Sequence, residues 1–151
     1  MNLYDLLHTH ANEILNEAVE AIVRGRVKNY VVAGQEHTHA RLKALLALTQ
    51  RAVKEKNLLP MLAHAELIAS QRHSAGFDLW EVQTAFNVLE EAIWKRIIKD
   101  LPPDQFAEAL GLVSTVLGAG KDALARSYVS LASKTKSPSL NMQSLFAGTE
   151  N

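Results

Sequence analysis

The sequence contains no cysteine, and neither sign of charge is in excess. Without cysteine the chain has no disulfides, thiolate zinc sites or cysteine nucleophiles. Lysine plus arginine and aspartate plus glutamate number 16 each, so no net field attracts nucleic acid or an anionic membrane. No apolar run approaches the ~18 residues of a membrane span, and the first residues do not resemble a signal peptide. We therefore expect a soluble, cytoplasmic protein without nucleic-acid or membrane partners.

The motifs of common enzyme classes are also missing. The fragment "GAGK" at residues 118–121 falls within a helical pattern instead of following a strand, so it is not a phosphate-binding loop. No Gly-x-Ser-x-Gly elbow supplies a nucleophile. The one β-like stretch, "NYVVAG" at residues 29–34, has no second strand with which to pair. These absences favour an all-α protein that is not an enzyme.

Apolar residues recur at spacings of three and four along most of the 151-residue chain, which is typical of amphipathic helices. The predicted helices run from Leu3 to the segment "RGRVKNY", from Glu36 to Asn57, from Pro60 to Gly76, from an Asp78 cap to "DLPPDQ", and from Pro103 to Ser133. We expect a single-domain bundle of about five helices, which could be globin-like, over residues 1–133. The Ser-containing residues 134–151 are expected to form a disordered or lightly docked tail.

Glycines mark two places in this pattern. Gly76 follows the third predicted helix, where a left-handed residue is a common stop, so we expect a positive φ there and a buried Phe77. Gly111, Gly118 and Gly120 lie inside the fifth predicted helix, where each costs about 1 kcal/mol relative to alanine. We therefore expect that helix to bend or to touch another one near "LGAGK".

The tetrapeptide His-Thr-His-Ala occurs twice, beginning at His8 and at His37. Histidines two residues apart on a helix point about 200° apart and cannot share one ion, and the single Glu-x-x-His, Glu36 to His39, does not make a di-iron bundle. Globin-type haem needs a later histidine than His73, the last one here. No metal or cofactor is therefore expected, and these histidines are interpreted as packing at helix margins.

A phosphotransfer role for His37 or His39 is the alternative function. The segment "HTHARLKAL" places the basic residues Arg41 and Lys43 close to these histidines in sequence. Such spacings also occur by chance in many helices. Phosphorylation by a cognate kinase, with an acid-labile label, would distinguish this alternative.

The segment "ELIASQRHSAGFDLWEVQTAFNVLEEAIWKRI" resembles the signature region of the RsbRD-type N-terminal domain, the helical module at the front of RsbT co-antagonist proteins of the stressosome. The matching elements are Arg72, Gly76, Phe77, Glu81, Ala85, Phe86 and Trp94. The resemblance implies a non-catalytic sensory or regulatory module of stress-response signalling, usually dimeric and without haem, that acts through a protein partner. In the co-antagonists a STAS output domain follows the helices, whereas residues 134–151 are too short for one. We therefore expect the module to act alone through a partner or with an output function on a separate chain.

Polar side chains close to bulky apolar ones in this segment indicate a cleft for a small ligand or a partner. The candidate residues are Arg72, Phe77, Trp80, Glu81, Phe86, Asn87 and Trp94. A homodimer is also expected, because Trp80 and Trp94 share a row that is offset from the core row of their helix. Gly111 and Gly118, on the following helix, would let the second copy approach closely.

Overall fold

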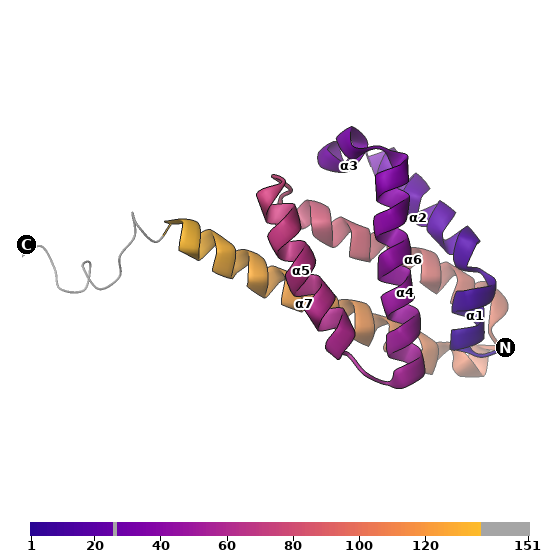
Figure 1. Ribbon diagram of the computed structural model, residues 1–151. Coiled ribbons are helices and arrows are strands. Elements are labelled where there is room, and N and C mark those ends of the chain that lie inside the picture. Colours follow the sequence, from indigo (N-terminus) through magenta and orange to yellow (C-terminus); the bar gives the residue numbers. More distant parts are fainter. Residues whose placement is uncertain (26, 137–151) are drawn as a thin grey trace, which may run out of the picture.

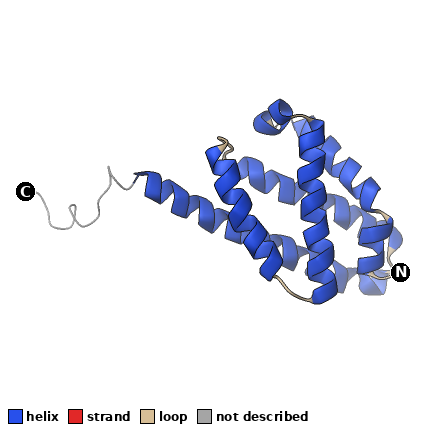
Figure 2. Cartoon of the chain, in the orientation of Figure 1, coloured by secondary structure: helices blue, strands red, loops and turns tan. Residues whose placement is uncertain are grey.

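The computed structural model describes residues 1–25 and 27–136, which fold into α-helices connected by short turns, with no strand among them (Figure 2). The elements are α1 (Leu3–Thr9), α2 (Ala11–Gly25), α3 (Lys28–Ala33), α4 (Gln35–Glu55), α5 (Leu59–Ser74), α6 (Leu79–Asp100), the 3-10 turn η1 (Pro103–Gln105) and α7 (Phe106–Lys136). The all-α prediction is confirmed. The expected tail lies outside the described residues, apart from 134–136, which extend α7 beyond the predicted end at Ser133.

The helices pack in two crossed groups. Figure 1 shows α4 and α5 at the front, joined at their lower ends and diverging upward, with α6 behind them. α5 packs along α7, and α6 packs against both α2 and α7. α3 caps the upper end of the bundle, beside the beginning of α4 (Figure 1). No helix among the described residues is long and apolar enough to cross a membrane.

The predicted helix count of about five is wrong, because the described residues form seven α-helices. The first predicted helix is divided at His10, which ends α1 with the backbone turned out of the helical range. Its amide donates to the carbonyl oxygens of Leu6 and His8, so the turn satisfies the end of α1 before α2 begins. The "NYVVAG" stretch, interpreted as an irregular joint with β character, instead forms the one-and-a-half turns of α3, which end at Gly34.

The predicted core rows are confirmed for α4 and, from Val82 onward, for α6. Some members of the predicted rows are only partly buried, namely Leu79 of α6 and Phe106, Leu110 and Leu131 of α7. Val82, Phe86, Leu89, Ile93 and Ile97 of α6 are all buried. The α4 row is buried throughout, including Thr49, whose hydroxyl donates to the Leu45 carbonyl oxygen within its own helix. Truncating one such fully buried aliphatic or aromatic side chain to alanine costs about 2–5 kcal/mol. These rows therefore supply most of the stability that fixes the positions of the polar residues described below.

α7 runs without a break past all three of its glycines, but only one of them allows a close approach. A Cβ on Gly120 would lie 2.7 Å from the Phe86 ring of α6 and 3.0 Å from the Met61 sulfur of α5. A Cβ on Gly111 or Gly118 would meet nothing within 4 Å. The expected contact near "LGAGK" is therefore confirmed, and Gly120 is the residue at which α5, α6 and α7 meet.

Candidate functional site

The turn between α5 and α6 positions several of the predicted site residues. Gly76 has φ +85°, and Phe77 is 7% exposed, so both expectations for this turn are confirmed. The Phe77 amide donates to the Arg72 carbonyl oxygen at 2.9 Å, which closes the end of α5. The Tyr128 hydroxyl of α7 donates to the Phe77 carbonyl oxygen at 2.9 Å, and the Tyr30 ring of α3 meets the Phe77 ring edge-on at 5.2 Å. The turn is thus held from both sides by tyrosines.

Glu81 is a buried carboxylate, 2% exposed, in the first turn of α6. One oxygen accepts from the Asp78 amide at 2.9 Å and from the Asn29 side-chain amide at 2.7 Å, and the other accepts from the Asn29 backbone amide at 3.0 Å. Burial raises the pKa of Glu81, but the bonds from Asp78 and Asn29 outweigh it and leave the pKa below its ordinary value. Glu81 therefore stays ionised and fastens α3 to the beginning of α6.

Two arginines approach the same turn from different helices. The guanidinium carbon of Arg41, on α4, lies 5.1 Å from the centre of the Phe77 ring and 6.0 Å from that of Tyr30. Cation–π contacts at such distances contribute about 0.5–2 kcal/mol, the larger values where water is excluded. The Nη1 atom of Arg41 is buried and has no hydrogen-bond partner among the described residues. A buried donor left without a partner costs about 1–3 kcal/mol, and more when it is charged.

Arg72, near the end of α5, is half-buried and lies within the field of Arg41. Burial and then the positive charge of Arg41 lower the pKa of Arg72 from its ordinary value. His64 lies about two turns before Arg72 on α5. Its pKa is lowered by burial and by the charge of Arg72. The charge of Arg72 is therefore felt by His64, and that of Arg41 by Arg72.

The structure brings three of the seven candidates together, namely Arg72, Phe77 and Glu81. Phe86 lies in the core beneath Gly120, 1% exposed. Trp80 and Trp94 are 57% and 39% exposed on the outer side of α6. Asn87, between them on the same face, accepts a hydrogen bond from the Lys121 ammonium of α7 at 2.9 Å. The seven residues are thus divided among the turn, the core and an outer face of α6.

The phosphotransfer candidates lie on the first turns of α4. His37 is exposed, and His39 lines a shallow surface pocket with Asn16, Glu20 and Glu36. Arg41, predicted to be their basic neighbour, instead places its guanidinium against Phe77 and Tyr30. The interpretation of Arg41 as part of a phosphotransfer neighbourhood is therefore not supported. Across the described residues, no group of three histidine, aspartate or glutamate side chains is placed to hold a metal ion.

The first histidine repeat contains a feature that the sequence did not reveal. The His10 ring bonds through Nδ1 to Glu13 and faces Asp100 of α6 through Nε2 at 3.4 Å. Arg96 completes the group by pairing with the same two carboxylates. The predicted role of His10 as a margin residue of one continuous helix is wrong, because His10 lies in the break between α1 and α2 and links that break to α6.

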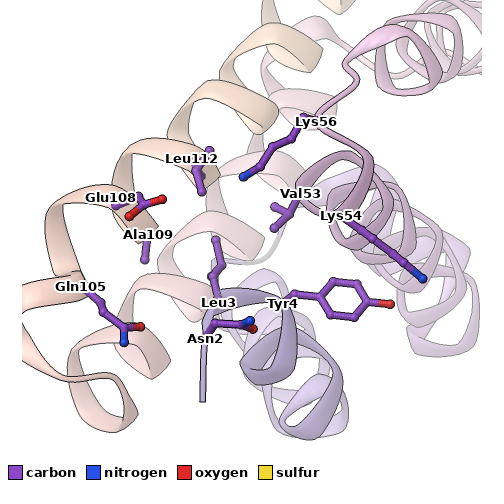
Figure 3. Close-up of a pocket in the computed structure, with 10 residues that line it drawn as sticks. All are labelled: Asn2, Leu3, Tyr4, Val53, Lys54, Lys56, Gln105, Glu108, Ala109 and Leu112. Carbon is purple, nitrogen blue, oxygen red and sulfur yellow. The ribbon is translucent and has the colours of Figure 1, made fainter.

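A surface pocket of about 540 Å³ lies at the opposite end of the bundle (Figure 3). Its apolar lining comes from Leu3, Val53 and Leu112, and Figure 3 shows Glu108 and Lys56 at its rim. The Lys54 ammonium lies 5.5 Å from the centre of the Tyr4 ring. Sequence reasoning missed this pocket because its residues come from α1, α4 and α7, far apart in the chain.

Residues 10–132 match the family model described as the RsbT co-antagonist protein rsbRD N-terminal domain. No curated protein and no solved structure matches the chain. The match covers most of the 151 residues, including every helix from α2 to most of α7. The chain therefore belongs to the rsbRD N-terminal domain family, and the resemblance inferred from the α5–α6 segment is confirmed.

Proposed function

We propose that this member of the rsbRD N-terminal domain family is a non-catalytic cytoplasmic regulatory module that acts as a homodimer and binds a protein partner in stress-response signalling. The observation that carries the proposal is the outer face of α6, where Trp80, Trp94 and Ile98 are 57%, 39% and 58% exposed. Large exposed apolar residues gathered on one helix are uncommon on monomers and often mark partner surfaces. Family membership supports a regulatory role.

A second copy fits this face because bulky and small residues lie side by side on it. Asn87 bonds Lys121 and Glu90 accepts from the Ser114 hydroxyl at 3.0 Å, so α6 and α7 run antiparallel along this surface. Trp94 is one turn beyond Glu90, and Gly111 is one turn before Ser114. A two-fold axis would bring each tryptophan onto the glycine surface of the other copy, which is the self-complementarity that an isologous interface needs.

Light scattering coupled to size exclusion tests the dimer. The wild-type chain should elute with the mass of two chains at tens of micromolar, and Trp94→Glu should elute as a monomer. The matched control is Leu67→Glu, since Leu67 is 56% exposed on α5, away from the α6 face. A monomeric wild type, or a Trp94→Glu dimer as tight as the control, would contradict the proposed interface.

Partner binding needs a separate experiment. The full chain would be used to capture proteins from its native cells, with residues 134–151 present and absent, and the captured partner would then be reconstituted from purified components. We expect the wild type and Leu67→Glu to bind the purified partner equally. A chain that binds no purified partner and instead turns over a substrate would overturn the regulatory proposal.

A further inference from the structure

The positive charges of Arg41 and Arg72 meet no negative charge on the part of the chain that the structure describes. Neither guanidinium takes part in an ion pair there. Arg72 makes one long hydrogen bond of 3.5 Å to the Gln71 side chain, and Arg41 makes none. The Arg41 guanidinium nonetheless lies against the Phe77 ring, and the backbone amide of Phe77 donates to the backbone carbonyl oxygen of Arg72.

The nearby buried carboxylate is not the missing counterion. Both oxygens of Glu81 are occupied by neutral donors, the amides of Asp78 and Asn29. The ionised Glu81 carboxylate is thus hydrogen-bonded to uncharged amides, while the buried Nη1 atom of Arg41 has no hydrogen-bond partner among the described residues. Buried polar groups in native proteins are nearly always paired, so this orphan leaves a donor that a bound ion or a water molecule would satisfy.

The geometry points to a site for one small oxyanion, a phosphate or a carboxylate, held between Arg41 on α4 and Arg72 on α5. We propose that the planar guanidinium groups supply paired N–H donors that match the oxygens of such an anion. The rings of Tyr30 and Phe77 hold Arg41 in place, so its donors are already ordered before the anion binds. The beginning of α4, which carries Arg41, and the end of α5, which carries Arg72, lie toward the same end of the bundle (Figure 1).

The proposal rests on the proposed function only in treating the anion as the signal that the module senses. Binding would stabilise the folded chain and would draw α4, α5 and the α5–α6 turn together. That turn leads directly into α6, whose outer face is the proposed dimer surface. The anion would thereby be linked to the geometry of the dimer.

Thermal unfolding of the full chain tests the site. Midpoints are compared in chloride, inorganic phosphate and acetate at equal pH and ionic strength. We expect phosphate, acetate or both to raise the midpoint above that in chloride with a saturable dependence on concentration, since a ligand that binds only the folded state stabilises it. The two anions distinguish a phosphate site from a carboxylate site, and calorimetric titration of the more effective one gives its Kd.

Three arginine variants provide the comparison. Arg41→Gln and Arg72→Gln should each weaken binding by at least about tenfold, as the loss of one charge-assisted bidentate contact implies. Arg51→Gln is the matched control, because Arg51 lies on α4 but is exposed and paired with Glu55, and its response should equal that of the wild type. In chloride alone, Arg72→Gln should be at least as stable as the wild type, because it removes one of two like charges.

Equal midpoints in all three salts, or a wild-type response in Arg72→Gln, would overturn the site. Neither result bears on the mass of the dimer or on binding of the purified partner. Failure of the anion site is therefore distinguishable from failure of the regulatory proposal.

Discussion

Replacing Gly120 by alanine should destabilise the protein even though alanine is the better helix former. The gain from helix propensity is about 1 kcal/mol. Against it, the new Cβ would lie 2.7 Å from the Phe86 ring and 3.0 Å from the Met61 sulfur. Phe86 and Met61 are 1% and 0% exposed, so neither can move into solvent, and overpacking of a filled core costs about 1–3 kcal/mol. The net loss should be about 0–2 kcal/mol.

Gly111→Ala and Gly118→Ala are the matched controls on the same helix, compared at a protein concentration low enough to keep the chain monomeric, because Gly111 belongs to the proposed dimer surface. With nothing within 4 Å of either Cβ, both should gain the propensity term of about 1 kcal/mol. Gly120→Ala should therefore be about 1–3 kcal/mol less stable than either control, a separation of several degrees in Tm. Urea unfolding at one fixed protein concentration measures all three. Equal stability of the three variants would refute the reasoning, since it would mean that Phe86 and Met61 repack without cost.

A double variant identifies the atom responsible. Phe86→Leu removes the ring atoms nearest to Gly120, so Gly120→Ala should cost less in that background than in the wild type. The expected coupling is about 0.5–3 kcal/mol, the range for residues in direct contact. Strict additivity would assign the loss at Gly120 to another cause.

Three further perturbations test the turn, the histidines and the buried carboxylate. Gly76→Val should destabilise the fold by about 1 kcal/mol or more, because φ at Gly76 is +85° and valine rarely adopts that conformation, although nothing lies within 4 Å of the added Cβ. Unchanged stability in urea would show that the turn adapts. His10→Ala should lower the free energy of unfolding by about 0.5–1.5 kcal/mol, because the bonds of the His10 ring are lost, whereas His37→Ala should change it by no more than about 0.5 kcal/mol. Equal losses in the two variants would show that the His10 contacts do not stabilise the fold. Elemental analysis should find no stoichiometric metal. Because the folded pKa of Glu81 is lowered, its ionisation stabilises the fold above the unfolded value of 4.5, and that contribution is lost as pH falls through the lower folded pKa. Glu81→Gln should therefore be less stable than the wild type at pH 7, with the gap narrowing below pH 4.5; a gap independent of pH would exclude this linkage.

Periodicity predicted the buried rows because it reports the environment of each side chain directly. The α6 row from Val82 to Ile97 is buried as its spacing indicates. It failed at His10, where neither proline nor glycine marks the break, since the turn is stabilised by Asp100 and Arg96 some ninety residues later. Periodicity also failed at α3. Val31 and Val32 are 56% and 79% exposed there, so their preference for strands does not determine the secondary structure of this segment.

The candidate site was predictable only in part. Phe77 and Glu81 follow a helix stop and a helix cap, which are local signals, and both proved to be buried at the turn. Asn29 and Tyr128 reach the same turn from residues about fifty positions away and carry no local signal of that contact. The place of Arg41 in "HTHARLKAL" says nothing about the aromatic rings that its guanidinium meets in the structure.

The bond from the Asn29 amide to Glu81 also makes this amide a reporter of local opening. Amides in the first turn of a helix have no partner within that helix, so at this position of α3 protection from hydrogen exchange comes only from a carboxylate 52 residues away. Exchange at Asn29 then measures how often α3 separates from α6, while amides in the middle of α6 exchange only through larger unfolding. One resonance would thus give the free energy of detaching α3, and its change on adding an anion or a partner would show whether either one tightens that end of the bundle.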